Sequence, residues 1–193
     1  MTPGLPPMVF IVDVEADGPC PGLYSMVSFG AVPLDPSRLA TSFYGQTAPI
    51  TDRYLPEALA ISGHSREAHL SFEAPGLVMP RFAQWVTDQA QGRPAVFMSD
   101  NPAFDWQFIN YYFHAFTGSN PFGSSARRIG DLAAGLKKKF FATSQWKSLR
   151  KTRHSHHPVD DARGNAEALL ALLRKHDVAL PGADLFANPS TSN

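Results

Sequence analysis

The sequence predicts a single α/β domain, and three features carry this prediction. Residues 8–17 form a short apolar run with β-branched side chains between proline and glycine, which is typical of a buried strand. Residues 23–34 alternate with a period of two, and residues 40–47 carry two aromatic side chains, so short connections favour an antiparallel meander. Helical patterns and one more apolar strand follow. A chain of 193 residues suits one domain, which we expect to span residues 1–186, with 187–193 as a frayed tail.

The later elements alternate between helix and strand. Residues 56–63 begin with a proline and end at a glycine, as a short helix does. Residues 75–91 have apolar positions at helical spacing, and residues 95–98 form a short apolar strand. Capping residue types at 99–101, followed by Pro102, predict the start of a strongly buried helix.

The last third of the chain holds one further long helix. Residues 127–132 are expected as a short edge strand or bend, and residues 146–149 as a short helix. Pro158 fits a first helical position, an apolar stripe follows it, and basic residues 174–176 suit the last turn. We see no internal repeat and no linker between domains.

Composition narrows the class of protein. Hydrophobic residues make up 44% of the chain and charged residues 18%, as in an ordinary globular protein. Seventeen basic residues balance 17 acidic ones, so no global positive charge indicates nucleic acid, although one groove can still concentrate such charge. The single cysteine, Cys20, fits a reducing compartment. Without a signal-peptide pattern or a run of about 20 apolar residues, we expect a soluble, cytoplasmic protein with no membrane partner.

Acidic residues stand at one end of the first predicted strand. Asp13 and Glu15 are separated by one residue, so they lie on the same side of that strand. Two adjacent carboxylates repel each other and resist loss of water, and a bound cation removes both difficulties. For this pair alone, a strand end that emerges into water is the simpler explanation.

More acids begin the two buried helices. Asp105 lies in the first turns of one, and Asp160 and Asp161 lie in the first turn of the other, where each alone is explained by the helix dipole. Clustered on core-facing elements, such acids would be costly without cations, and oxygen ligands suit Mg²⁺ or Mn²⁺. Two such ions can stabilise both the attacking and the leaving oxygens of a phosphoryl displacement, and a nearby histidine can accept a proton. The residues therefore predict metal-dependent phosphoester hydrolysis.

At these positions the chain resembles the 3′–5′ exonucleases of the DEDDh type. An apolar strand ending in D-x-E matches residues 11–15, N-x-x-F-D matches residues 101–105, and H-x-x-x-x-D opening a helix matches residues 156–161. Residues 58–63 (ALAISG) are similar to the family's stretch that lies against the terminal nucleotide. The resemblance runs from about residue 9 to residue 173. Three motifs in order on the expected elements are specific, whereas D-x-E alone is common.

The resemblance implies an RNase H-like fold, with a mixed five-stranded sheet flanked by helices. It also implies that four acids hold two Mg²⁺ or Mn²⁺ ions, with the first acid contacting both: Asp13, Glu15, Asp105 and Asp161. His156 would be the general base for the attacking water, and nucleoside 5′-monophosphates would be released. His156 has the family's five-residue offset from Asp161, whereas the same offset from Asp160 falls on Ser155, which cannot serve as that base.

Residues beside the motifs and in the basic segment before His156 are expected to contact substrate. They are Ala16, Ile61, Gly63, Asn101, Phe104, Trp106, Lys147 and Arg150. Aromatic side chains, with Tyr24 and Trp146 as further candidates, can stack on bases, while basic ones can follow phosphates. Core packing is the alternative for Phe104 and Trp106. His154 and His157 are expected to line the groove or lie at the surface.

The expected partner is the 3′ end of single-stranded RNA or DNA. RNA is favoured because no polymerase-binding extension is evident, and relatives in the family suggest a homodimer. Ala16 stands where the family often has threonine, and Asp17 is an extra acid without an assigned role. Two other functions stay open: a catalytically silent nucleic-acid-binding domain of the same fold, and a phosphodiesterase of small nucleotides.

Overall fold

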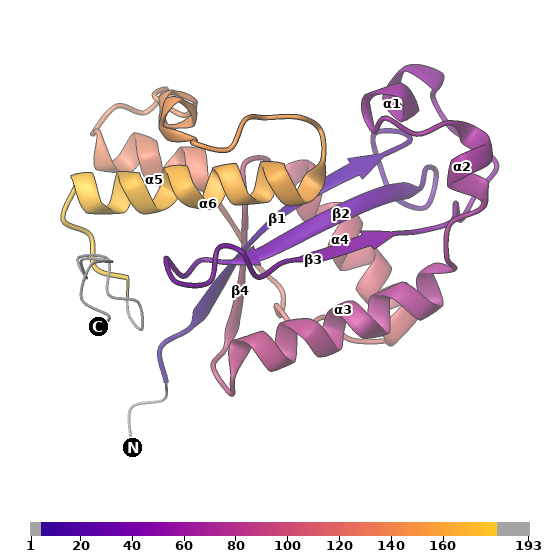
Figure 1. Cartoon of the computed structure of the whole chain (residues 1–193), viewed down its shortest axis with the longest axis horizontal. Coiled ribbons are helices and arrows are strands. Elements are labelled where there is room, and N and C mark those ends of the chain that lie inside the picture. Colours follow the sequence, from indigo (N-terminus) through magenta and orange to yellow (C-terminus); the bar gives the residue numbers. More distant parts are fainter. Residues whose placement is uncertain (1–4, 181–193) are drawn as a thin grey trace.

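A five-stranded mixed sheet forms the centre of the protein in a computed structural model that describes residues 5–180 (Figure 1). In chain order the strands are β1 (Met8–Ala16), β2 (Met26–Pro33), β3 (Phe43–Gln46), β4 (Ala95–Ser99) and β5 (Ala126–Arg128). They lie in the order β3-β2-β1-β4-β5. The first three pair antiparallel, as the predicted meander requires, whereas β4 is parallel to β1 and β5 is parallel to β4. The predicted mixed five-stranded sheet is confirmed.

Helices cover both faces of this sheet, as Figure 1 shows. They are α1 (Pro56–Ile61), α2 (Arg66–Leu70), α3 (Pro75–Ala90), α4 (Pro102–Thr117), α5 (Ile129–Leu136), the 3₁₀ helix η1 (Gln145–Leu149) and α6 (Pro158–Lys175). An aromatic core joins α3 and α4 to one face, and an aliphatic core joins α5, η1 and α6 to the other. The long helices α3, α4 and α6 confirm the helices predicted from the spacing of apolar residues.

Two short helices escaped prediction. The expected edge strand or bend at 127–132 divides between β5 and α5, because Ile129 and Ala133 turn into the aliphatic core after only three strand residues. Two glycines in α5 lower its helix propensity, so tertiary packing decides that segment. α2 is a single turn that begins after Ser65, whose hydroxyl accepts the Ala68 N–H.

The second strand is buried along its whole length, whereas its period-two pattern indicates one polar face. α6 covers that second face. A β-carbon added at Gly30 would lie 2.5 Å from the carbonyl carbon of Pro158 and from the nitrogen of Val159. Gly30 is also paired with Asp13 across the β1–β2 ladder. The missing side chain therefore brings the start of α6 close to Asp13.

Three other expectations concern single segments. Trp146 is fully buried in the aliphatic core, which excludes the proposed stacking on bases, because its ring fills the space between η1 and α6. The tail expected at 187–193 lies outside the described residues. Within residues 5–180, no helix has the length and apolarity needed to cross a membrane.

Candidate active site

A cleft of about 520 Å³ lies where β1 ends, between the starts of α4 and α6 and the helix α1. Most of the residues predicted for the site line this cleft. They are Asp13, Glu15, Ala16, Ile61, Asn101, Phe104, Asp105 and His156. The three motifs, which stand at residues 11–15, 101–105 and 156–161, therefore meet in one place.

Three carboxylates form the centre of the cleft. One oxygen from each of Asp13, Glu15 and Asp161 lies within 4.8 Å of the others. The strand period puts the first two on the same side of β1, and α6 brings the third over β2. The structure thus brings Asp161 to the strand acids. Asp160 instead pairs with Arg163 at 2.9 Å, and its side chain is 42% exposed.

A loop before α6 fixes the Asp161 carboxylate. Its two oxygens accept the backbone N–H groups of Ser155 at 2.9 Å and His156 at 3.0 Å. The Nδ1 atom of His154 lies 2.8 Å from Oδ2 of the same carboxylate. His156 has a φ of 60°, a left-handed conformation that side chains rarely adopt, and the two N–H bonds hold it there.

Asp105 joins α4 to the central strand. Its Oδ1 accepts the Val14 N–H at 3.2 Å, and its Oδ2 accepts the Asn101 N–H at 3.3 Å. The Asn101 side chain, expected as a helix cap, makes no capping hydrogen bond; the Asn101 carbonyl accepts the N–H groups of Phe104 and Asp105 instead. Asp105 is only 4% exposed. Its position next to Asp13 is therefore set by the backbones of β1 and α4.

The clustered acids resist ionisation. Burial raises the pKa of Asp13 well above its ordinary value, and the charges of Asp105, Asp161 and Glu15 raise it further. Burial, followed by the charges of Asp161 and Asp105, raises the pKa of Glu15 to about 7. Burial also raises the pKa of Asp105 to about 7, against its N–H partners, which lower it. A divalent cation would relieve this repulsion, and the oxygen donor set fits Mg²⁺ or Mn²⁺.

Two histidines face the acids. The Nδ1 atom of His156 lies 3.5 Å from Oε1 of Glu15, and the His154 and His156 rings lie 4.4 Å apart. Both line the cleft, and both side chains are half-exposed. His157 points elsewhere and stacks on Tyr44 of β3 at 4.9 Å. Of the two histidines expected to line the groove or lie at the surface, His154 lines it.

Comparison with known proteins identifies the family. No protein-family model matches the chain. The chain is 36% identical over 164 residues to the 3′-5′ DNA exonuclease Cap18 of Escherichia coli, covering 81% of this chain and 86% of that protein. The chain belongs to the DEDDh-type 3′–5′ exonucleases.

Solved structures share the fold. The nuclease domain of 3′hExo, a DEDDh family member bound to rAMP, superposes with a TM-score of 0.68 at 14% identity, over 90% of this chain and 94% of that one. Zinc-bound E. coli exonuclease I in complex with single-stranded DNA gives a TM-score of 0.66 at 18% identity. That match covers 88% of this chain and 41% of exonuclease I. At these identities the likeness concerns the fold.

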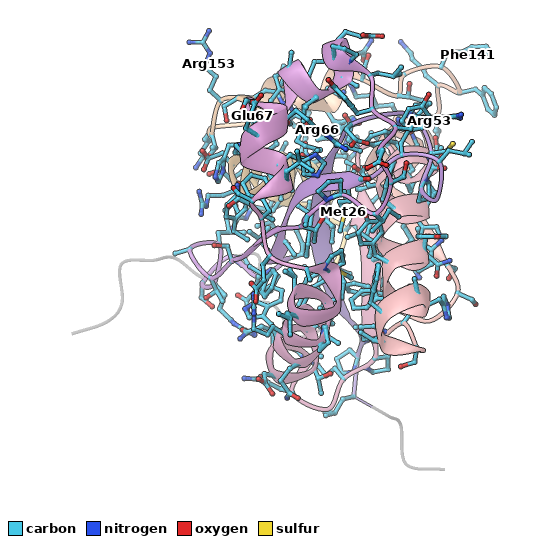
Figure 2. The ribbon with its side chains drawn as sticks, turned by 90° about the vertical axis from the view of Figure 1, so that its right-hand side faces the viewer. Met26, Arg53, Arg66, Glu67, Phe141 and Arg153 are labelled. Carbon is cyan, nitrogen blue, oxygen red and sulfur yellow. The ribbon has the colours of Figure 1, made fainter. Side chains whose placement is uncertain are left out.

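The extra acid of the first motif holds the cleft wall of this DEDDh exonuclease, a role that sequence reasoning missed. The Asp17 side chain is fully buried and accepts the Ser25 N–H at 2.6 Å and Arg66 Nη1 at 3.1 Å. Its backbone oxygen accepts the Leu55 N–H at 2.8 Å. Arg66 also bonds the Thr51 oxygen at 3.1 Å. Figure 2 shows Arg66 of α2 pointing inward. This network fixes the segment that leads into α1, whose Ile61 lines the cleft.

The substrate residues predicted for this DEDDh exonuclease divide into two groups. Ala16, Ile61, Asn101 and Phe104 line the cleft. Gly63 does not line it; with a φ of 75° it follows the end of α1.

Trp106 packs edge-on against Phe97 at 5.0 Å, so of the two alternatives the structure supports core packing. Lys147 and Arg150 form ion pairs with Asp100, a residue of the cleft lining. Both basic side chains also lie over the buried Trp146 ring.

Proposed function

We propose that this chain is a divalent-metal-dependent exonuclease that shortens single-stranded DNA from its 3′ end and releases nucleoside 5′-monophosphates. The observation that carries the proposal is the cluster of Asp13, Glu15 and Asp161, with Asp105 beside it, in a cleft that also contains His156. DNA replaces the RNA favoured from sequence because the relative at 36% identity is named a DNA exonuclease.

Four acids would hold two Mg²⁺ or Mn²⁺ ions: Asp13, Glu15, Asp105 and Asp161. Asp13 is the best candidate for a ligand shared by both ions, because the charges of the other three acids all act on it. Bound ions of this kind supply electrostatic stabilisation of charge at the scissile phosphate. The protein contributes ligands fixed in advance by the N–H bonds to Asp105 and Asp161.

His156 is proposed to take the proton of the attacking water. With Nδ1 turned toward Glu15, Nε2 is the ring nitrogen that would accept it. The loop conformation that places the ring is fixed by the bond from its own N–H to Asp161. His154 touches Asp161 directly and would position that ligand. Ile61 and Phe104 supply apolar walls that would flank the terminal base.

The chain offers a matched pair of variants to test this proposal. Asp161→Asn removes a charge from the cluster, and Asp160→Asn removes one from the adjacent position of the same helical turn. With 5′-labelled single-stranded DNA and RNA in Mg²⁺ or Mn²⁺, we expect stepwise shortening by the wild type and by Asp160→Asn. Asp161→Asn should lose at least about 100-fold in turnover, because a fixed ligand is removed.

The other outcomes separate the alternatives. Oligonucleotide binding without cleavage would support a silent binding domain, and cleavage of mononucleotide esters alone would support a small-nucleotide phosphodiesterase. Equal loss in both variants would contradict the choice of Asp161. His156→Ala should lose most turnover while divalent-ion affinity, measured by calorimetry, is kept; an unchanged rate at neutral pH would refute its role as base. The homodimer stays a prediction.

A further inference from the structure

Two adjacent phenylalanines on the loop of residues 137–143 lie almost wholly in solvent. Phe140 is 85% exposed and Phe141 is 91% exposed, with ring centroids 5.0 Å apart at 85°. Of the phenylalanines within residues 5–180, these two alone are exposed. Burying a phenylalanine is worth about 1.5–3 kcal/mol, so a folded chain gains nothing by leaving two rings outside its core. Exposed apolar groups gathered in this way indicate an interaction surface.

The exposure is built into the fold. The loop is held by backbone bonds from Lys138 to Gly135 at 3.0 Å, from Lys139 to Ala134 at 3.0 Å, and from Ala142 to Lys139 at 2.9 Å. Ala142 is buried, and the Thr143 carbonyl accepts the indole N–H of Trp146 at 2.8 Å. Both ends of the loop are therefore fixed to the aliphatic core while the rings point outward. Figure 2 shows Phe141 at the upper margin of the molecule, and in Figure 1 the loop follows α5, at the other end of the long axis from α2.

Positive charge surrounds the two rings. Lys138 and Lys139 line a groove with them, and within residues 5–180 neither lysine forms an ion pair. Arg128 lines the same groove, and Asp131, its acidic residue, already pairs with Arg128 at 3.1 Å. The groove thus combines flat apolar rings with cations, the combination that binds bases and phosphates of single strands.

The groove adjoins the active-site cleft. The Nε atom of Arg128 donates to the backbone oxygen of Asp100 at 3.2 Å, and Asp100 lines the cleft. Lys147 pairs with the Asp100 carboxylate, and Arg150 lies 3.9 Å from it. Basic side chains therefore continue from the cleft rim to the loop without interruption by an unpaired acid.

We propose that Phe140 and Phe141 form a second nucleic-acid subsite, which stacks bases of the strand upstream of the cleaved 3′ nucleotide while Lys138, Lys139 and Arg128 hold its phosphates. This inference rests on the proposed function. The loop acts on the grip of long strands and leaves the chemistry at the 3′ end unchanged. Short substrates that end before the loop do not reach it.

The test compares long and short DNA on loop variants. In Phe140→Ala/Phe141→Ala, we expect KM for an oligonucleotide of about 20 nucleotides to rise by about 5-fold to 140-fold for each base that loses its stacking partner, at roughly 1–3 kcal/mol per stacked base. Turnover at saturation and the hydrolysis of a trinucleotide should stay at wild-type values. Leu77→Ala is the matched control, because Leu77 is 59% exposed and lies on α3 at the opposite face of the sheet.

Conservative variants separate base stacking from a docking surface for another protein. Phe140→Trp/Phe141→Trp should retain the affinity for the long oligonucleotide, whereas Phe140→Leu/Phe141→Leu, which keeps apolar surface without an aromatic face, should lose it. Lys138→Ala/Lys139→Ala should lower the salt dependence of binding by about 0.7 in logarithmic slope for each phosphate that the variant no longer neutralises.

Each remaining outcome decides between the two proposals. If the wild type shortens DNA and the phenylalanine variants match it on long strands, the subsite is refuted and the exonuclease assignment stands. Binding of labelled oligonucleotide, measured by anisotropy in the Asp161→Asn background, tests the subsite apart from cleavage. If Asp161→Asn binds the long oligonucleotide, and adding Phe140→Ala/Phe141→Ala to it weakens that binding, the subsite is supported even where the wild type fails to cleave.

Discussion

Gly30 is the position where a single methyl group should separate activity from folding. Its added β-carbon would lie 2.5 Å from backbone atoms of Pro158 and Val159, roughly 1 Å inside ordinary van der Waals contact. Backbone cannot rotate away as a side chain can, so the start of α6 must move by a similar amount. Asp161 sits in that first turn, and Asp13 is paired with Gly30 across the ladder. This displacement therefore changes the distance between two proposed metal ligands, Asp13 and Asp161.

The expected magnitude follows from that displacement. Overpacking of this kind costs about 1–3 kcal/mol of stability, which a domain of this size survives. A misplacement of about 1 Å at a reacting centre costs on the order of 100-fold in rate. In Gly30→Ala we therefore expect a protein that folds, binds divalent ions more weakly and shortens single-stranded DNA about 100 times more slowly.

Thermal unfolding, ion titration and single-turnover cleavage measure these three effects. Gly76→Ala is the control, because its added β-carbon in α3 meets no atom within 4 Å. That variant should keep full activity and gain a few tenths to about 1 kcal/mol of stability. A folded Gly30→Ala protein with wild-type rate and ion affinity would refute the reasoning that close approach of α6 sets the site.

Two further predictions concern charge. The pKa of Glu15 is raised to about 7, so between about pH 4.5 and 7 the folded protein holds a proton that the unfolded chain has lost. The free energy of unfolding of the metal-free protein should therefore fall as pH rises through this range, by up to about 1.4 kcal/mol per pH unit for each extra proton. The pKa of His69 is lowered to about 4, so below pH 6.5 this residue makes the free energy of unfolding rise with pH. The contribution of the acid cluster is therefore measured as the difference in unfolding free energy between wild type and Glu15→Gln. If that difference keeps its pH dependence at saturating Mg²⁺, the ion does not bind at Glu15. Asp17→Ala should lower the free energy of unfolding by about 3–5 kcal/mol, because it leaves Arg66 without its buried partner, and it should weaken substrate binding because the segment that leads into α1 is no longer fixed. Asp52→Ala, at an exposed position, is the control. Equal stability of the two variants in chemical denaturation would contradict the network.

The elements that carry chemistry were predictable from sequence because each has a strong local signal. An apolar run that ends in Asp13 and Glu15 is typical of a buried strand whose acids lie on one side, and Pro102 and Pro158 mark the two helix starts. The offset between His156 and Asp161, taken from the family resemblance, pointed to the acid of an adjacent pair that the structure brings to the strand acids, whereas Asp160 lies at the surface.

The features that position those elements gave no such signal, because they depend on contacts between distant segments. From sequence alone, Asp17 is an acid that follows a strand and has no assigned role. Its partner, Arg66, lies 49 residues later in the chain, so only the folded structure brings the two side chains together. From sequence alone, Gly30 is a glycine that weakens a strand; in the structure, the backbone at the start of α6 lies so close to it that no side chain fits. The exposed Phe140 and Phe141 are the converse case, because sequence hydrophobicity would bury them and the structure does not. In each case a contact between distant segments overrules the local pattern: Asp17 fixes a wall of the cleft, Gly30 lets two carboxylates approach each other, and the loop after α5 presents the rings of the proposed subsite.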